Sequence, residues 1–271
     1  MKIATIARNT ADSPNMVEND AALLQSIEER LAAMGHYVKR TNETELFDGY
    51  DAICQMTRTP EILALLKNVE KTGCKVINTP AAVERCSREA FTQILDKNNI
   101  PQPPHRAITT IDDTKTLQFP GWIKKSNGWS RTKEDIAYVT NKEEATEAFN
   151  YIKENGNNAL YFEHIKGDII KFYAVNGYYF TYLYPQCEGT KFGYEKINGT
   201  ANHYPFDNEV LKKTAFDAAT AIGLDIFGGD AIITPEGDIY IIDINDFPSF
   251  SAVREIAARH IADSIILKAS K

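Results

Sequence analysis

The sequence lacks the cysteine and histidine spacings that mark zinc sites and disulfide frameworks. None of its four cysteines belongs to a C-x-x-C pair or has a histidine nearby at zinc-ligand spacing; they are Cys54, Cys74, Cys86 and Cys187. Paired or metal-bound thiols are therefore not expected to organise the fold. We expect free, buried thiols in a reducing cytoplasm.

Long apolar runs and a basic-then-apolar leader are also missing. No run approaches the roughly 18 apolar residues of a membrane-spanning helix, and the first ten residues enter a predicted strand directly. We therefore expect neither secretion nor a membrane partner, in keeping with a cytoplasmic location.

The chain has no surplus of positive charge. Its 271 residues have a formal net charge of -7 and a pI near 5.4. A general nucleic-acid-binding surface is not expected, although a local basic cleft could still hold phosphates. With 43% hydrophobic residues, the chain can bury a sizeable core in one large domain or two to three small ones.

Glycine is absent from residues 8–12, the turn after the first predicted strand. A dinucleotide-binding fingerprint needs glycines there, so a Rossmann-type nicotinamide or flavin enzyme is not expected. Strands and helices nevertheless alternate over residues 1–80, which predicts a small parallel sheet covered by helices. A helix over Pro80–Asn99 and the proline-rich linker 98–104 follow, so we expect a domain boundary between about residues 80 and 104.

The stretch 223–250 predicts two strands joined by a tight turn. Asp230 opens the first apolar run, residues 235–238 supply turn chemistry, and Asp243 and Asn245 follow the second run. Because side chains alternate along a strand, Asp243 and Asn245 share one face. Two carboxylates and an amide oxygen converging on one spot suit Mg²⁺ carrying phosphate. The plainer explanation is a hairpin with charges at its exposed ends.

A predicted strand over residues 121–125 ends in Lys124 and Lys125 and leads into the polar, basic loop 126–133. A lysine beside a loop that can close over an anion suits polyphosphate binding. The plainer alternative is a solvated hairpin with two exposed lysines.

Three further strands are predicted at residues 160–165, 169–175 and 178–184, and the middle one carries Lys171. His164 ends the first of them and could act as a general base. A lone histidine at a strand end is more often structural, however, and no residue nearby in the sequence pairs with it.

The order of these features resembles the ATP-grasp superfamily over about residues 80–271. The matching residues are Lys124 with its loop, Phe162 to Ile165, Gly167, Asp168, Asp230, Asp243 to Asn245 and Pro248. The resemblance implies an α/β (α+β) protein with an ATP-grasp domain at residues 81–271, including a lid subdomain at about 105–165. A small parallel α/β domain at residues 1–80 would precede it.

The resemblance also implies ATP and two Mg²⁺ ions as cofactors. The expected nucleotide-binding residues are Arg88, Lys124, Phe162, Glu163, His164, Ile165 and Asp168. The main chain of Glu163 and Ile165 would contact adenine, and Asp168 the ribose hydroxyls. The expected metal ligands are Asp230, Asp243 and Asn245, and the expected catalytic residues are Lys171 and Arg131. Ser249, Ser251 and Arg254, just after the metal strand, would hold the acceptor substrate.

Some positions depart from the family pattern. Asp243 stands where most ligases of the family have glutamate, Ser249 where they have glycine, and the loop has a single glycine, Gly128. The Asp-x-Asn ending with a phenylalanine-proline pair is similar to inositol-polyphosphate kinases. The general order equally resembles the glutathione-synthase-like and ribosomal-protein glutamate ligase branches.

Three functions follow for a small-molecule substrate. We expect first a carboxylate-amine ligase that acts through an acyl-phosphate, because the general order of the motifs resembles the glutathione-synthase-like and glutamate ligase branches. The alternative is a kinase of the inositol-phosphate type, for which the basic candidates in the acceptor cleft are Arg131, Lys133, Lys191 and Lys196. A non-catalytic nucleotide-binding module is the third reading. The oligomeric state stays open, with a homodimer as one arrangement.

Overall fold

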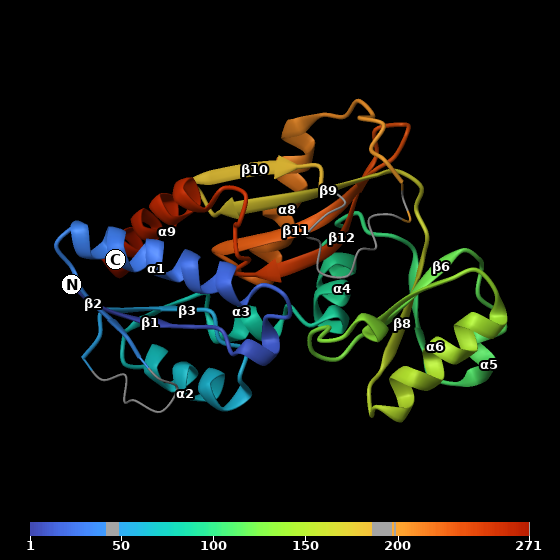
Figure 1. Cartoon of the computed structure of the whole chain (residues 1–271), viewed down its shortest axis with the longest axis horizontal. Coiled ribbons are helices and arrows are strands. Elements are labelled where there is room, and N and C mark those ends of the chain that lie inside the picture. The colour runs from blue at the N-terminus through green and yellow to red at the C-terminus, as the bar shows by residue number, and fades with distance from the viewer. Residues whose placement is uncertain (42–48, 186–196, 198, 271) are drawn as a thin grey trace.

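The computed structural model describes residues 1–41, 49–185, 197 and 199–270 of the chain (Figure 1). They form an α/β protein with three four-stranded sheets, one parallel and two antiparallel, covered by helices. Within these residues, no helix combines the length and apolar character needed to cross a membrane.

The first sheet is parallel and has the strand order β2-β1-β3-β4. Its strands are β1 (Lys2–Ile6), β2 (Tyr37–Arg40), β3 (Ala52–Gln55) and β4 (Lys75–Ile77). Helices α1 (Val17–Ala33) and α2 (Pro60–Glu70) lie on opposite faces of this sheet, and the 3-10 helix η1 (Thr10–Asp12) follows β1 (Figure 1). The parallel sheet predicted for residues 1–80 is therefore confirmed.

The helix expected over Pro80–Asn99 is wrong in one respect, because the chain forms two helices there. Thr79 accepts a hydrogen bond from the backbone of Ala82 and starts α3 (Pro80–Glu84). The backbone becomes extended again at Ser87, and a second helix, α4 (Arg88–Lys97), begins. This break places Arg88 at the first turn of a new helix that faces the centre of the molecule.

The second sheet is antiparallel, with the order β5-β8-β6-β7. Its strands are β5 (His105–Ile108), β6 (Gly121–Lys125), β7 (Ile136–Val139) and β8 (Ala159–Glu163). The short helix α5 (Ile111–Thr114) and α6 (Lys142–Glu154) pack together on it, and the 3-10 helix η2 (Lys133–Asp135) precedes β7. We call this unit the lid sheet.

The third sheet is antiparallel and has the order β10-β9-β11-β12. Its strands are β9 (Asp168–Val175), β10 (Tyr179–Leu183), β11 (Ile226–Ile233) and β12 (Ile239–Asp246). Buried alanines let α8 (Asn208–Ile222) pack closely, and α4 shares this hydrophobic core with α8 and the sheet. The hairpin predicted at residues 223–250 is thus formed by β11 and β12.

The C-terminal helix α9 (Arg254–Ala269) lies beside α1 and joins the first and third sheets (Figure 1). Buried side chains of α1, α9, β3 and β9 form one hydrophobic cluster, which includes Leu24, Cys54, Val175 and Ile261. The parallel sheet therefore shares its core with the C-terminal part of the chain. Cys54, Cys74 and Cys86 are buried and free, as expected, whereas Cys187 lies outside the described residues.

Candidate functional site

A cavity of about 760 Å³ lies where the lid sheet, the third sheet and the carboxyl edge of the first sheet meet. Its volume is in the range of small-molecule sites. Eleven of the residues expected from the sequence line it: Arg88, Lys124, Phe162, Glu163, Ile165, Lys171, Asp230, Asp243, Asn245, Ser249 and Ser251. Residues more than 160 positions apart in the chain are therefore brought into one site.

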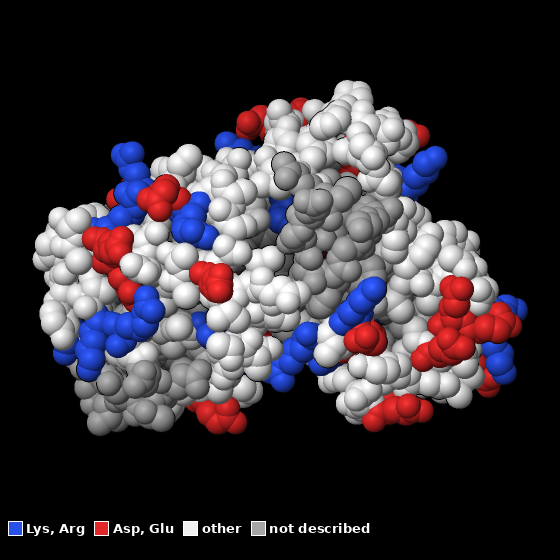
Figure 2. Space-filling view, in the orientation of Figure 1, with Lys and Arg blue, Asp and Glu red and all other residues white. Residues whose placement is uncertain are grey.

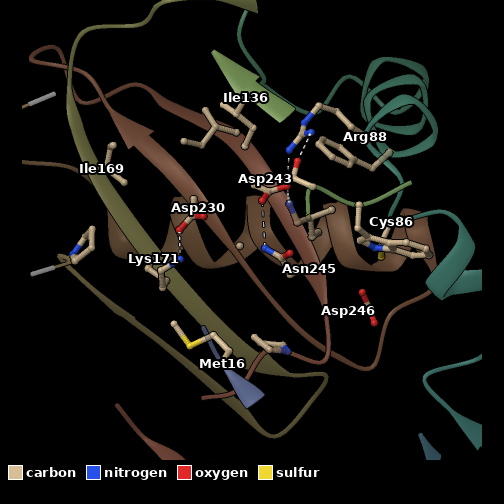
Figure 3. A pocket seen from close by; sticks show the side chains of 18 of the residues that line it. Met16, Cys86, Arg88, Ile136, Ile169, Lys171, Asp230, Asp243, Asn245 and Asp246 are labelled. Atoms are coloured by element: carbon tan, nitrogen blue, oxygen red, sulfur yellow. Dashed lines mark hydrogen bonds and ion pairs between the residues drawn. The ribbon is translucent and has the colours of Figure 1, made fainter. Parts of the chain in front are cut away.

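Three charged side chains lie on neighbouring strands at the floor of this cavity. Asp230 on β11 pairs in register with Lys171 on β9 and with Asp243 on β12. The Nζ of Lys171 donates a hydrogen bond of 2.6 Å to Oδ1 of Asp230 (Figure 3). Burial opposes the charge of Lys171, but the Asp230 carboxylate outweighs it, so the pKa of Lys171 is raised.

Asn245 completes this group from the same face of β12, where Nδ2 donates to Oδ2 of Asp243 at 3.4 Å (Figure 3). The strands approach closely here because Gly229 has no side chain; a Cβ at that position would collide with the carbonyl oxygen of Asp243. A register shift between Asp230 and Ala231 marks an irregularity beside the site.

Arg88 and Lys124 approach the floor from the other side of the cavity. Nη1 of Arg88 donates to the carbonyl of Lys125 at 2.8 Å and to Oγ of Ser130 at 3.3 Å. Its Nη2 lies 4.0 Å from Oδ1 of Asp243 (Figure 3). The buried Nε has no hydrogen-bond partner among the described residues. Arg88 is thus a fixed cation directed at the acidic floor.

Lys124 lies over apolar rings, with Nζ 5.1 Å from the ring centre of Phe162 and 5.7 Å from that of Trp122. Burial and the charge of Arg88 lower the pKa of Lys124 to about 8, and the carboxylates of Asp243 and Asp230 oppose this only in part. No carboxylate of the described residues lies within 4.0 Å of its ammonium group. Among the residues that the structure describes, Lys124 therefore has no ion pair, and its charge is available to a phosphate.

The donor set on the floor fits a divalent cation. Asp230 and Asp243 offer carboxylate oxygens with side-chain exposures of 22% and 32%, and Asn245 adds an amide oxygen. Hard oxygen ligands with room for water and phosphate suit Mg²⁺. The described residues contain no cluster of three histidine, cysteine or acidic side chains, so this site would need ligand oxygens from elsewhere.

Two of the expected residues beside the lid sheet do not line the cavity. Arg131, expected to be catalytic, donates from Nε and Nη2 to Oδ1 of Asp12 at 3.0 and 2.8 Å and is not among the lining residues. Nδ1 of His164 accepts a hydrogen bond from Nε1 of Trp122, and its ring makes an edge-on contact with the ring of Tyr138. Burial lowers its pKa. These contacts support a structural role for His164.

Asp168 and Arg254 also bind other parts of the protein. The buried carboxylate of Asp168 accepts hydrogen bonds from the backbone N–H groups of Asn202 and Tyr204 at 2.7 and 2.9 Å, although the resemblance implied a ribose contact. Arg254 donates to Oδ1 of Asn19 at 2.8 Å. Lys191 and Lys196 lie outside the described residues.

The end of β8 uses two of its backbone N–H groups within the protein. The N–H of Glu163 donates to the carbonyl of Pro104 at 2.9 Å, and that of His164 donates to Pro120 at 3.3 Å. A base contact at Glu163 would therefore fall on its carbonyl oxygen.

Sequence reasoning missed a group of buried charges at the edge of the first sheet. Arg8 and Arg58 both contact Asp246, and their side chains are only 4% and 7% exposed. Arg8 also pairs with Asp20 at 3.0 Å. Asp246 directly follows Asn245, but a partner nearly 190 positions away leaves no local signal.

Charges of both signs are interspersed over the face of the molecule shown in Figure 2, without a broad basic patch. Within the cavity, the described lining residues include five cations and six carboxylates. The cations are Arg8, Arg58, Arg88, Lys124 and Lys171; the carboxylates are Asp12, Asp20, Glu163, Asp230, Asp243 and Asp246. The site has no cationic surplus of its own.

No family model matches the chain. It is 22% identical over 241 residues to human N-acetylaspartylglutamate synthase A, a match that covers 80% of this chain and 59% of that protein. The chain thus spans about three fifths of the length of this curated relative.

Solved structures cover the whole chain. The D-alanine–D-alanine ligase from Bacillus anthracis complexed with ATP has a TM-score of 0.74 at 14% identity, over 100% of this chain and 97% of that one. A RimK domain ATP-grasp protein from Sphaerobacter thermophilus also has a TM-score of 0.74, at 17% identity over 98% and 100%. The ATP-grasp ligase PsnB complexed with minimal precursor, Mg and ADP has a TM-score of 0.67, at 14% identity over 99% and 98%. The chain has the ATP-grasp fold.

Proposed function

We propose that this protein is an ATP- and Mg²⁺-dependent carboxylate-amine ligase. The observation that carries the proposal is that Lys124 and Arg88 face Lys171, Asp230 and Asp243 across one cavity. Cations opposite a set of hard oxygens are what a bound polyphosphate with its metal ions needs. The match to N-acetylaspartylglutamate synthase A, whose name describes an amide-forming enzyme, supports the ligase reading.

The side chains have separate tasks in this proposal. Lys124 and Arg88 bind the phosphate oxygens, and Lys171 neutralises charge at the transferred phosphoryl group. Asp230, Asp243 and Asn245 would hold one or two Mg²⁺ ions, whose positive charge would neutralise the phosphates. Phe162, Glu163 and Ile165 line the cavity, and in this proposal they would contact the adenine.

The reaction needs no nucleophile from the protein. A carboxylate oxygen of the substrate attacks the γ-phosphorus, the bond to ADP breaks, and an acyl-phosphate forms. The amine then attacks the acyl carbon, phosphate leaves, and the nitrogen loses a proton. Loop 126–133, whose Trp129 and Ser130 line the cavity, would exclude the water that competes with the amine.

The balance of charges in the cavity favours a ligase over an inositol-phosphate kinase. A polyphosphorylated acceptor requires cations beyond those that hold ATP. The described lining has five cations and six carboxylates, and each of Arg8, Arg58 and Lys171 already contacts a carboxylate. A small carboxylic acid needs fewer cations in the site than a polyphosphorylated acceptor does.

The test is a screen of small acids, amines and polyols in which ADP and free phosphate are measured separately. A ligase releases both in equal amounts only when acid and amine are present together. ADP without free phosphate, in the presence of a polyol, would replace the proposal with a kinase. Nucleotide binding without turnover under every condition would favour a binding module.

We also propose the division into a domain at residues 1–80 and an ATP-grasp domain at 81–271, with the lid subdomain at about 105–165. The lid sheet, whose strands lie between residues 105 and 163, supports the last of these. Limited proteolysis in the 98–104 segment, followed by mass determination of the fragments, would test the boundary.

A further inference from the structure

Loop 126–133 is joined to the first sheet by two contacts. The guanidinium carbon of Arg58, just after β3, lies 5.0 Å from the ring centre of Trp129. Arg131 forms an ion pair with Asp12, in the turn after β1, at 2.8 Å. Both partners of the loop thus lie at the carboxyl edge of the parallel sheet.

Arg58 also binds the end of the strand that carries the proposed metal ligands. Its Nε and Nη2 donate to Oδ1 of Asp246 at 2.9 and 2.6 Å. Asp246, the last residue of β12, is 1% exposed and lies three positions beyond Asp243. A planar guanidinium held by two hydrogen bonds has a fixed orientation, so its flat face is already oriented to lie against the indole of Trp129.

We infer that Arg58 is a positioning residue that couples the end of β12 to loop 126–133. Asp246 binds the edge of the Arg58 guanidinium, and Trp129 covers its face. We call this contact the first clasp of the loop, and the Arg131–Asp12 ion pair the second clasp. Together they hold the loop against the first sheet and across the cavity. Only the purpose of this closure, exclusion of water from a reacting acyl-phosphate, rests on the proposed function.

The clasp can be tested without nucleotide or substrate. The chain has two tryptophans, so Trp122→Phe leaves Trp129 as the sole reporter. In this background, acrylamide quenching of fluorescence measures how far the indole is shielded. We expect the quenching constant to rise roughly twofold in Arg58→Met, while Arg58→Lys, which keeps a cation over the ring, restores part of the shielding.

Arg131→Gln tests the second clasp with little risk to folding, because the Arg131 side chain is 58% exposed. It should also raise the quenching constant. The matched control is Arg106→Gln, an exposed arginine of the lid sheet that bonds Asp113 and Thr116 outside the cavity and should change nothing. Quenching in Arg58→Met and Arg131→Gln equal to that of the parent would overturn the inference.

A second measurement separates this inference from the proposed function. With MgATP and no acceptor, Arg58→Lys should release phosphate severalfold faster than the parent, because a less firmly held loop admits water. Calorimetry on the parent reports whether MgATP binds at all. If it does not bind, the proposed function fails, and the quenching series still decides whether the clasp exists.

Discussion

Lys171 and Asp230 face each other on adjacent strands, with Nζ 2.6 Å from Oδ1, and both side chains line the cavity. The carboxylate proposed to bind Mg²⁺ is thus also the partner of a lysine. A metal ion at Asp230 must compete with Lys171 or cause its ammonium group to move, for example towards a phosphate oxygen. In the proposed site, the pair would link metal binding to nucleotide binding.

Lys171→Met tests this link. Without the ammonium group, Asp230 no longer shares its charge with Lys171, so we expect Mg²⁺ alone to bind about three- to tenfold more tightly. MgATP should bind more weakly, because one phosphate contact is lost. Isothermal titration with Mg²⁺ and with MgATP measures both. The control is Lys125→Met on β6, and parallel changes in the two affinities would contradict the competition.

Asp243→Asn tests the metal assignment. The substitution keeps the shape of the side chain but removes one of the two charged ligands, so the Mg²⁺ concentration that half-saturates ATP binding should rise about tenfold or more. Asp238→Asn, at the turn of the same hairpin, is the matched control because its exposed side chain lies away from the cavity. Equal Mg²⁺ dependence in both variants would reject Asp243 as a ligand.

The grouping of the three proposed metal ligands could be predicted from the sequence because its geometry is local. Asp230, Asp243 and Asn245 belong to one hairpin whose turn residues and apolar alternation determine which side chains share a face. The place of Lys171 in the site was harder to predict, because its pairing with Asp230 depends on the register between strands about 60 positions apart. The family resemblance supplied that residue, and the periodicity of the sequence alone did not.

Contacts between distant parts of the chain could not be predicted from the sequence. Arg131 could be recognised as a basic loop residue, but its choice of Asp12 depends on how the lid sheet meets the first sheet. The break at Ser87 was missed because the helical periodicity continues through it, although serine is a common N-cap residue and Ser87 is the N-cap of α4. Arg58 gave no signal at all, because Asp246 is distant in sequence.

Asp168→Asn distinguishes a structural anchor from a ribose ligand. As an anchor, the carboxylate holds the N–H groups of Asn202 and Tyr204, so the free energy of unfolding in urea should fall by about 1–3 kcal/mol. The affinity for ATP should stay nearly constant. Asp217→Asn, an exposed change on α8, is the control. Weaker ATP binding at unchanged stability would instead support the ribose contact that the resemblance implies.

Lys124 should make ATP binding depend on pH. In the free protein its pKa is lowered to about 8 by burial and by Arg88. Bound phosphates favour the charged ammonium and raise this pKa. Below pH 7 the lysine is protonated in both states and contributes no pH dependence. Above pH 8 binding must take up a proton, so the Kd for MgATP should rise, by up to about tenfold per pH unit.

Calorimetry at pH 7.5, 8.5 and 9.5, in buffers of different ionisation enthalpy, measures both the Kd and the proton uptake. Lys124→Arg keeps a positive charge over this whole range, so its proton uptake should vanish and its Kd should become nearly independent of pH. Lys124→Met should lose about 1–3 kcal/mol of binding free energy at pH 7.5, the worth of a charged hydrogen bond. If Lys124→Arg retains the proton uptake of the parent, another group titrates on binding and the pH dependence does not come from Lys124.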